Sequence, residues 1–313
     1  MKMIFMGTPD FSAGALDALI QAGHTVTAVV TQPDKPRGRS GQLVPSPVKE
    51  CALRHGIPVL QPVRIKAPEA MEELRRYEAD VFVVAAFGQI LSREILEMPK
   101  YGCINIHASL LPKYRGASPI QHVILNGESV TGITIMQMDT GVDTGDMLYK
   151  KEIAIAPTDT FETLHDKLMV LGGEAIVEAL RLLEEGKLTP VKQEGETCYA
   201  SLIDKTMGRI DFSADALSVD RRIRGMNPWP SAYTFYKGKQ LKIWRAKPLE
   251  WIQNDEEKKA PGDILTVGKD FFDVVCGTGI LRVEELQLEG KKRMSAHDFL
   301  LGVKLSTTDK LGE

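Results

Sequence analysis

Two polar stretches of this sequence carry residue types that are suited to reactions at a carbonyl group. The first runs from Asn105 to Pro112, reads Asn-Ile-His-Ala-Ser-Leu-Leu-Pro, and follows the short run Gly-Cys-Ile at 102–104. Asn105 and His107 are two residues apart, so in a strand their side chains project to the same side. A neutral amide donor beside an imidazole that titrates near neutral pH suits proton-coupled chemistry at a carbonyl. A histidine at a strand end can also be purely structural, and this stretch alone leaves both interpretations open.

The second stretch, residues 137–146, is rich in Asp and Gly and follows the apolar run 132–136. This pattern is typical of a strand end that opens into a tight loop. In open α/β sheets, chemistry is usually carried by residues at strand ends. If the two stretches follow neighbouring strands, a carboxylate of the second reaches the imidazole of His107. The sequence therefore predicts one site built from both stretches.

The elements that must position these loops follow the alternation of an α/β sheet. Residues 2–7, 25–31 and 80–86 are short apolar runs typical of buried strands, and amphipathic segments such as 12–22 separate them. We therefore expect a Rossmann-like, doubly wound α/β domain. Its first turn, Gly7-Thr8-Pro9-Asp10, lacks a G-x-G-x-x-G pattern, which argues against a dinucleotide cofactor.

The last third of the chain has a different pattern. Residues 216–225 predict a short basic helix. Five short runs beyond it predict strands, at 232–236, 240–244, 262–267, 271–275 and 280–288. Such strands suggest a small β-barrel of the oligonucleotide-binding (OB-like) type. We therefore expect three parts, namely a catalytic domain at 1–187, a linker at 188–206 and an OB-like domain at 207–313.

The composition excludes several classes of protein. With 313 residues, 43% of them hydrophobic and 26% charged, the chain is typical of a globular protein. Apolar runs such as 81–87 are too short to cross a bilayer, and no signal-peptide pattern opens the sequence, so we expect a cytoplasmic protein with no membrane partner. The four cysteines are scattered without a C-x-x-C pair, which argues against a zinc site and a disulfide framework.

Basic residues are concentrated in two places. Residues 32–47 form a long Gly- and Pro-containing segment, expected to be an irregular loop, which carries Lys35, Arg37 and Arg39. Residues 207–248 hold 9 Lys and Arg against 3 Asp and Glu, although the whole chain has a net charge of −3. Both features suit contacts with phosphates, and both are also compatible with an ordinary solvated surface.

Residues 105–112 and 139–145 resemble the folate-dependent formyltransferases, because they match the patterns N-x-H-x-S-L-L-P and D-x-G-x-D-T-G. Residues 7–11, 32–49 and 290–300 resemble those members of the family that act on tRNA, so the resemblance covers essentially the whole chain. It implies transfer of the formyl group of 10-formyltetrahydrofolate to the α-amino group of methionine on initiator methionyl-tRNA, for translation initiation. It also implies a monomer. We expect no metal, because the formyl carbon is already electrophilic.

The resemblance implies roles for individual residues. The catalytic residues of the family correspond to Asn105, His107 and Asp143. The residues implied to contact folate are Ser109, Leu110, Leu111, Pro112, Phe87, Gly88, Gln89, Ile90 and Leu91. The residues implied to contact tRNA are Lys35, Arg37 and Arg39. Phe87 stands where we expect Tyr in many relatives, a change that keeps the pocket and removes one hydroxyl.

Two other functions are compatible with parts of the sequence. A sugar-nucleotide formyltransferase shares the three catalytic residues and a small second domain, but it has no need of the basic loop or of the end Lys291-Lys292-Arg293. A non-catalytic RNA-binding protein belongs to a different class. The presence of all three catalytic residue types argues against it.

Overall fold

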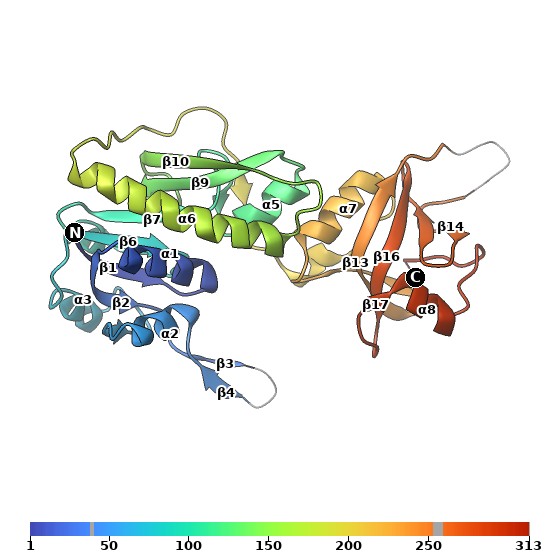
Figure 1. Ribbon diagram of the computed structural model, residues 1–313, viewed down its shortest axis with the longest axis horizontal. Coiled ribbons are helices and arrows are strands. Elements are labelled where there is room, and N and C mark those ends of the chain that lie inside the picture. The colour runs from blue at the N-terminus through green and yellow to red at the C-terminus, as the bar shows by residue number, and fades with distance from the viewer. Residues whose placement is uncertain (38–40, 253–258, 313) are drawn as a thin grey trace. The chain divides into compact units, whose positions relative to one another are not determined.

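The computed structural model describes residues 1–37, 41–252 and 259–312. These residues form two compact units, each with its own set of strands and helices (Figure 1). The first unit comprises 1–119, 130–154 and 165–200. The second comprises 120–129, 155–164 and the described residues from 201 onward. Of the segment expected to be a linker, residues 188–200 therefore pack with the first unit and 201–206 with the second.

The first unit contains a seven-stranded sheet. Its strands are β1 (Lys2–Gly7), β2 (Thr25–Val30), β5 (Val59–Leu60), β6 (Val81–Ala85), β7 (Cys103–His107), β9 (Val130–Gln137) and β10 (Met147–Ala154). They lie in the order β10-β9-β7-β6-β1-β2-β5. The five strands from β7 to β5 are parallel, whereas β9 runs antiparallel to β7, and β10 to β9. The predicted α/β class with a parallel sheet is confirmed.

The strand β10 forms one edge of this sheet. It is a single strand that pairs with β9 from Met147 to Ala154, with an irregularity in the pairing between Met147 and Tyr149. Because β10 is an edge strand, its side chains are half-buried or exposed, and the sequence lacks the apolar run of an inner strand.

Helices cover both faces of this sheet. They are α1 (Asp10–Gln21), α2 (Pro47–Arg54), α3 (Pro68–Leu74), α4 (Arg93–Leu96) and α6 (Phe161–Glu184). α1 and α6 lie side by side on one face, where Gly172 lets α6 approach Ile106 of β7 and Ile133 of β9 (Figure 1). On the other face a core cluster joins Cys103 of β7 to apolar residues of α3 and α4. Since side chains alternate along a strand, Asn105 and His107 share the face of Cys103.

The second unit is built on an antiparallel sheet. Its strands are β12 (Ala232–Tyr236), β13 (Lys239–Leu249), β14 (Ile264–Val267), β15 (Phe272–Val275), β16 (Ile280–Leu288) and β17 (Met294–Ser295). Its helices are α5 (Pro119–Leu125), α7 (Ala216–Gly225), α8 (Ala296–Gly302) and the short 3₁₀ helix Lys205–Gly208. The predicted helix and the antiparallel strands are confirmed. Among the described residues the pairing runs β12-β13-β16-β15-β14, with β17 beside β16, and this path ends at β12 and β14.

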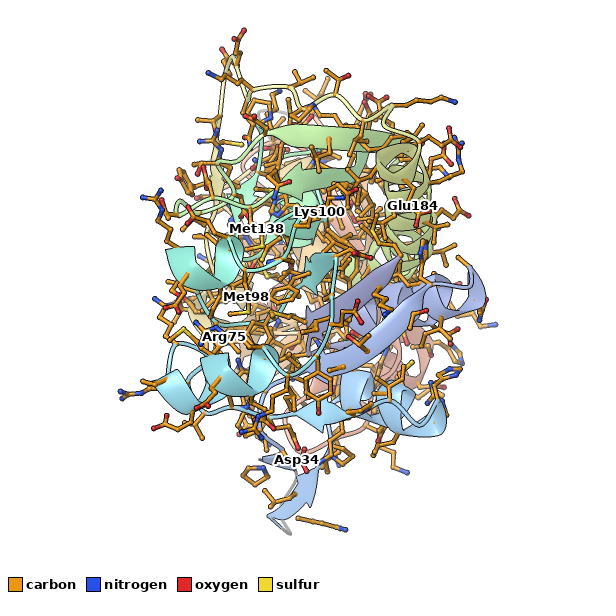
Figure 2. All side chains as sticks on the ribbon, turned by 90° about the vertical axis from the view of Figure 1, so that its left-hand side faces the viewer. Asp34, Arg75, Met98, Lys100, Met138 and Glu184 are labelled. Carbon is orange, nitrogen blue, oxygen red and sulfur yellow. The ribbon has the colours of Figure 1, made fainter. Side chains whose placement is uncertain are left out.

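A short hairpin interrupts the segment that we expected to be irregular. Strands β3 (Lys35–Arg37) and β4 (Gln42–Val44) pair antiparallel. Asp34, which lies where the hairpin leaves the rest of the first unit (Figure 2), accepts from Lys49 Nζ at 2.7 Å and from Gln61 Nε2 at 2.7 Å. The Lys49 and Gln61 contacts also lower the pKa of the Asp34 carboxyl. The prediction of an irregular loop was therefore wrong in part, because anchored ends let the two short strands pair.

Two further features bear on the class of protein. No helix in the described part of the chain combines the length and the apolar character needed to cross a membrane. All four cysteines are free. Burial raises the pKa of the Cys103 and Cys276 thiols to about 12, so both side chains stay neutral at physiological pH and serve as core residues.

Candidate active site

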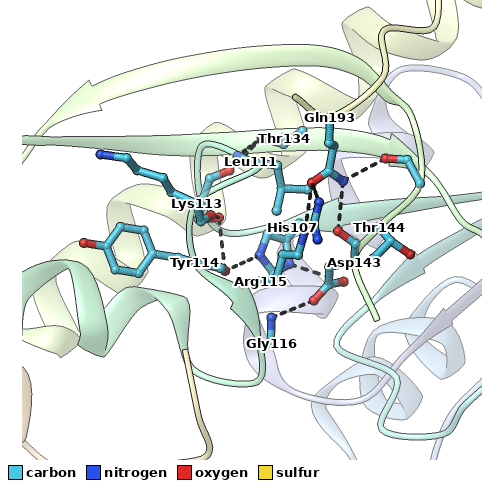
Figure 3. Close-up of polar contacts among 12 residues, drawn as sticks. His107, Leu111, Lys113, Tyr114, Arg115, Gly116, Thr134, Asp143, Thr144 and Gln193 are labelled. Carbon is cyan, nitrogen blue, oxygen red and sulfur yellow. Dashed lines mark hydrogen bonds and ion pairs between the residues drawn. The ribbon is translucent and has the colours of Figure 1, made fainter. Parts of the chain in front are cut away.

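His107 ends β7 and has one hydrogen-bonded nitrogen and one that faces a carboxylate. The ring is buried, with 6% of the side chain exposed. Its Nε2 lies 2.8 Å from the carbonyl oxygen of Tyr114. Because a carbonyl oxygen only accepts, Nε2 must carry a proton and donate it. Nδ1 is then the nitrogen open to proton exchange, and it lies 3.7 Å from Oδ1 of Asp143 (Figure 3).

Asp143 is held in a conformation that few non-glycine residues adopt. Its φ of 52° lies in the left-handed region, which costs on the order of 1 kcal/mol unless the surroundings impose it. The backbone N–H of Gly116 donates to Oδ2 at 2.8 Å, and Gln193 Nε2 donates to the Asp143 carbonyl oxygen at 2.9 Å. These contacts point the carboxylate at His107. The two predicted loops therefore meet, while the catalytic roles of Asp143 and His107 stay a prediction.

Asn105 lies near the carboxyl end of β7, which is an inner strand of the sheet. It is half-buried in β7, paired with Val84 of β6 on one side and Met136 of β9 on the other. Within the described residues its side-chain amide makes no hydrogen bond to the protein. A half-buried amide that the fold leaves unpaired is a group that a ligand can use.

The loop that follows His107 is held by β9, which lies beside β7, and by β10, which lies beside β9. Thr134 Oγ1 of β9 donates to the carbonyl oxygen of Ser109 at 2.7 Å and accepts from the N–H of Leu111 at 3.0 Å. Lys150 Nζ of β10 donates to the carbonyl oxygen of Leu111. Burial lowers the pKa of Lys150. Thr134 and Lys150 belong to no sequence motif of the site, because only the pairing of β9 with β7 and β10 brings them to this loop.

We expect Thr134→Val to loosen this loop. Valine matches threonine in shape but leaves the Ser109 oxygen and the Leu111 N–H without their partner, which should cost about 1–3 kcal/mol of unfolding free energy. Urea unfolding measures this cost. Thr131→Val is the matched control on the same strand, since the buried Thr131 hydroxyl has no partner in the described part of the chain. Equal unfolding free energies for the two variants would contradict the proposed clamp.

The residues predicted to contact folate differ in exposure. Phe87, Leu91, Ser109 and Leu111 are buried, Gln89, Leu110 and Pro112 are half-buried, and Gly88 and Ile90 are exposed. The side chain of Gln89 already accepts from Ile65 N and donates to the carbonyl oxygen of Pro62. The buried side chains among them support the backbone of the two segments, 87–91 and 109–112. Their contacts with folate stay a prediction, as do the tRNA contacts of Lys35 and Arg37, while Arg39 lies outside the described residues.

Two family models identify the class of enzyme to which this open α/β sheet, with these side chains at its carboxyl edge, belongs. The formyl transferase model matches residues 1–180, and the formyl transferase C-terminal domain model matches residues 202–304. Relatives that match the whole chain identify a particular family within this class. Methionyl-tRNA formyltransferase of Lachnospira eligens is 52% identical, with 100% of both chains covered, and that of Geobacter metallireducens is 52% identical, covering 100% of this chain and 99% of the relative. The chain therefore belongs to the methionyl-tRNA formyltransferase family.

Solved structures agree on the fold. An N-formyltransferase from Helicobacter canadensis, in complex with folinic acid and dTDP-3-aminofucose, has a TM-score of 0.67 at 17% identity, covering 94% of this chain and 100% of that one. Methionyl-tRNA formyltransferase from Clostridium thermocellum has a TM-score of 0.54 at 19% identity, covering 79% of this chain and 93% of that one. At these identities the likeness concerns the fold alone.

Proposed function

We propose that the chain transfers the formyl group of 10-formyltetrahydrofolate to the α-amino group of methionine on initiator methionyl-tRNA. The observation that carries this proposal is that Asn105 and His107 share one face of β7 and that Asp143 faces His107 where this strand ends. An unpaired amide donor lies two residues from an imidazole whose exchangeable nitrogen faces a carboxylate. The 52% identity to methionyl-tRNA formyltransferases along the whole chain supports the choice of acceptor.

The proposed reaction joins the amino nitrogen to the formyl carbon and breaks the bond between that carbon and N10 of the folate. The amine attacks in its unprotonated form, and the formyl oxygen becomes an oxyanion in the tetrahedral intermediate. The side-chain amide of Asn105 donates a hydrogen bond to this oxygen. Such a bond typically lowers the activation free energy by about 3 kcal/mol. The proton released by the amine is passed to N10. No metal is needed in this scheme, because an amine is already a competent nucleophile.

His107 moves the proton in this scheme. Its Nε2 stays engaged with the carbonyl oxygen of Tyr114, so Nδ1 gives or takes the proton at the reacting atoms. The carboxylate of Asp143, 3.7 Å from Nδ1, stabilises the positively charged ring and holds its orientation. This separation exceeds a direct hydrogen bond, and we expect it to shorten when substrates bind.

Transfer of labelled formyl tests the function directly. The protein is incubated with labelled 10-formyltetrahydrofolate and either methionyl-tRNA or an amino-sugar nucleotide, and label is counted in each product. Label in the tRNA supports the proposal, while label only in the sugar nucleotide overturns it.

We further propose that domain 1–187 carries the chemistry and domain 207–313 contacts tRNA. The monomeric state and the cytoplasmic location stay predictions.

The hairpin β3–β4 offers a separate test of tRNA binding. We expect the triple variant of Lys35, Arg37 and Arg39 to Ala to raise the KM for methionyl-tRNA. It should also reduce the slope of log affinity against log salt concentration by about 2–3, because each of the three lost phosphate contacts contributes roughly 0.7–0.9. The affinity for folate should not change. Kinetic assays at several salt concentrations measure both effects.

A variant with the same change of charge is the control. Lys2, Arg93 and Lys187 are exposed cations of the first unit that pair with nearby carboxylates. Changing these three to Ala should leave the salt slope as it is. If both triple variants shift the slope equally, the hairpin has no special role and only the net charge of the protein matters.

A further inference from the structure

We propose that Gln193 is a positioning residue for Asp143, and that Arg115 orients Gln193 for this task. The inference rests on the proposed function, since it concerns how one of the three catalytic residues is held. Gln193 lies in the segment 188–206, which the sequence suggested to be only a linker. It is 50 residues from Asp143 along the chain and lies outside the motifs that predicted the site.

Gln193 holds the turn that presents the carboxylate. Its Nε2 donates to the carbonyl oxygen of Asp143 at 2.9 Å and to that of Gly145 at 2.8 Å (Figure 3). One amide group therefore spans the turn around Thr144. Because the φ of Asp143 is left-handed, the direction of its side chain depends on this turn staying closed. Without the two bonds, both carbonyl groups lose the partner that stabilises the strained conformation.

Arg115 fixes which end of the Gln193 amide faces the turn. Its Nε and Nη2 donate to Gln193 Oε1 at 3.0 Å and 2.8 Å. A guanidinium group only donates, so the amide oxygen must face Arg115 and the NH₂ group must face the two carbonyls. The next residue, Gly116, donates its N–H to the Asp143 carboxylate at 2.8 Å. Gly116 thus holds the carboxylate of Asp143, and Gln193 holds its backbone carbonyl group. Arg115 in turn holds the side-chain amide of Gln193.

The backbone around Gln193 is anchored independently of its side chain. On one side Val191 exchanges two hydrogen bonds with Met147, at the start of β10, with lengths of 2.8 Å and 2.9 Å. On the other side β11 (Tyr199–Ala200) pairs in parallel with β8 (Arg115–Gly116). A substitution of the side chain therefore leaves the course of the segment in place. Its effect should fall on the turn at Asp143.

The variant Gln193→Glu separates positioning from simple structural support. Glutamate keeps the length and the acceptor for Arg115, and it gains an ion pair, but it cannot donate to the two carbonyls. We expect kcat for formyl transfer to fall by about 10- to 100-fold, with little change in either KM, because the loss is one of orientation. Gln21→Glu is the matched control, since the exposed side chain of Gln21 bonds to Asp17 within α1 and lies outside the proposed site. It should leave kcat unchanged.

A double-mutant cycle with Asp143→Asn decides whether Gln193 acts through Asp143. If it does, Gln193→Glu lowers kcat in the otherwise natural protein and has little further effect beside Asp143→Asn. An equal loss in both backgrounds indicates general structural damage and overturns the inference, as does full activity of Gln193→Glu. Full activity of Asp143→Asn removes Asp143 from the proposed mechanism, and the inference with it. Should Gln193→Glu fail to fold, Gln193→Met provides the same cycle without a charge.

Discussion

We expect His107→Ala to lower the kcat of formyl transfer by about 10²- to 10⁴-fold, the usual contribution of a general acid or base. The imidazole is a group of the proposed site that can take up and release a proton, and its Nδ1 is the exchangeable nitrogen. Folate affinity should change little, because the ring is buried and its Nε2 bonds to the protein itself. Single-turnover transfer of labelled formyl gives the rate, and a folate binding titration gives the affinity.

The stability of the variant must be followed in parallel. Loss of the ring removes one donor from the Tyr114 carbonyl oxygen, but Ser109 Oγ also donates to that oxygen, at 3.3 Å. We therefore expect His107→Ala to stay folded, with a small drop in the thermal midpoint. His55→Ala is the control, because His55 lies at the surface and pairs with Asp17. Turnover of His107→Ala near that of the natural protein would remove His107 from the mechanism.

Asn105→Ala should lower kcat by about 10²- to 10³-fold, as expected when a hydrogen-bond donor to an oxyanion is removed. The fold should not suffer, because within the described residues the Asn105 amide has no partner to lose. This combination of a large kinetic effect and an unchanged thermal midpoint is the signature of a residue reserved for the transition state. Rapid-quench kinetics and differential scanning calorimetry provide the two measurements.

Asn105→Asp sharpens the test. The substitution keeps the shape of the side chain and replaces the donor by a carboxylate, which repels a developing oxyanion. Its kcat should therefore lie below that of Asn105→Ala. If both variants raise the KM for folate and leave kcat intact, Asn105 binds the ground state and does not stabilise the intermediate.

The local parts of the fold and site were predictable from the sequence. Asn105 and His107 share a face because they are two positions apart in a strand, a periodicity that holds wherever the strand lies. The run 280–288 was predicted with the ends that β16 has. By contrast, β3 and β4 were missed, because their pairing depends on how Lys49 and Gln61 anchor Asp34 at the base of the hairpin.

By itself the sequence determined the class of fold, the family and the residue types at the site, because these follow from periodicity and from motifs of neighbouring residues. Only the tertiary structure decided that β9 lies beside β7, and hence that Asp143 reaches His107. It alone brought Gln193 to Asp143 and Arg115, which are 50 and 78 positions away. Contacts between residues so far apart in the sequence depend on how the fold arranges the segments in space. A pattern of neighbouring residues does not determine that arrangement.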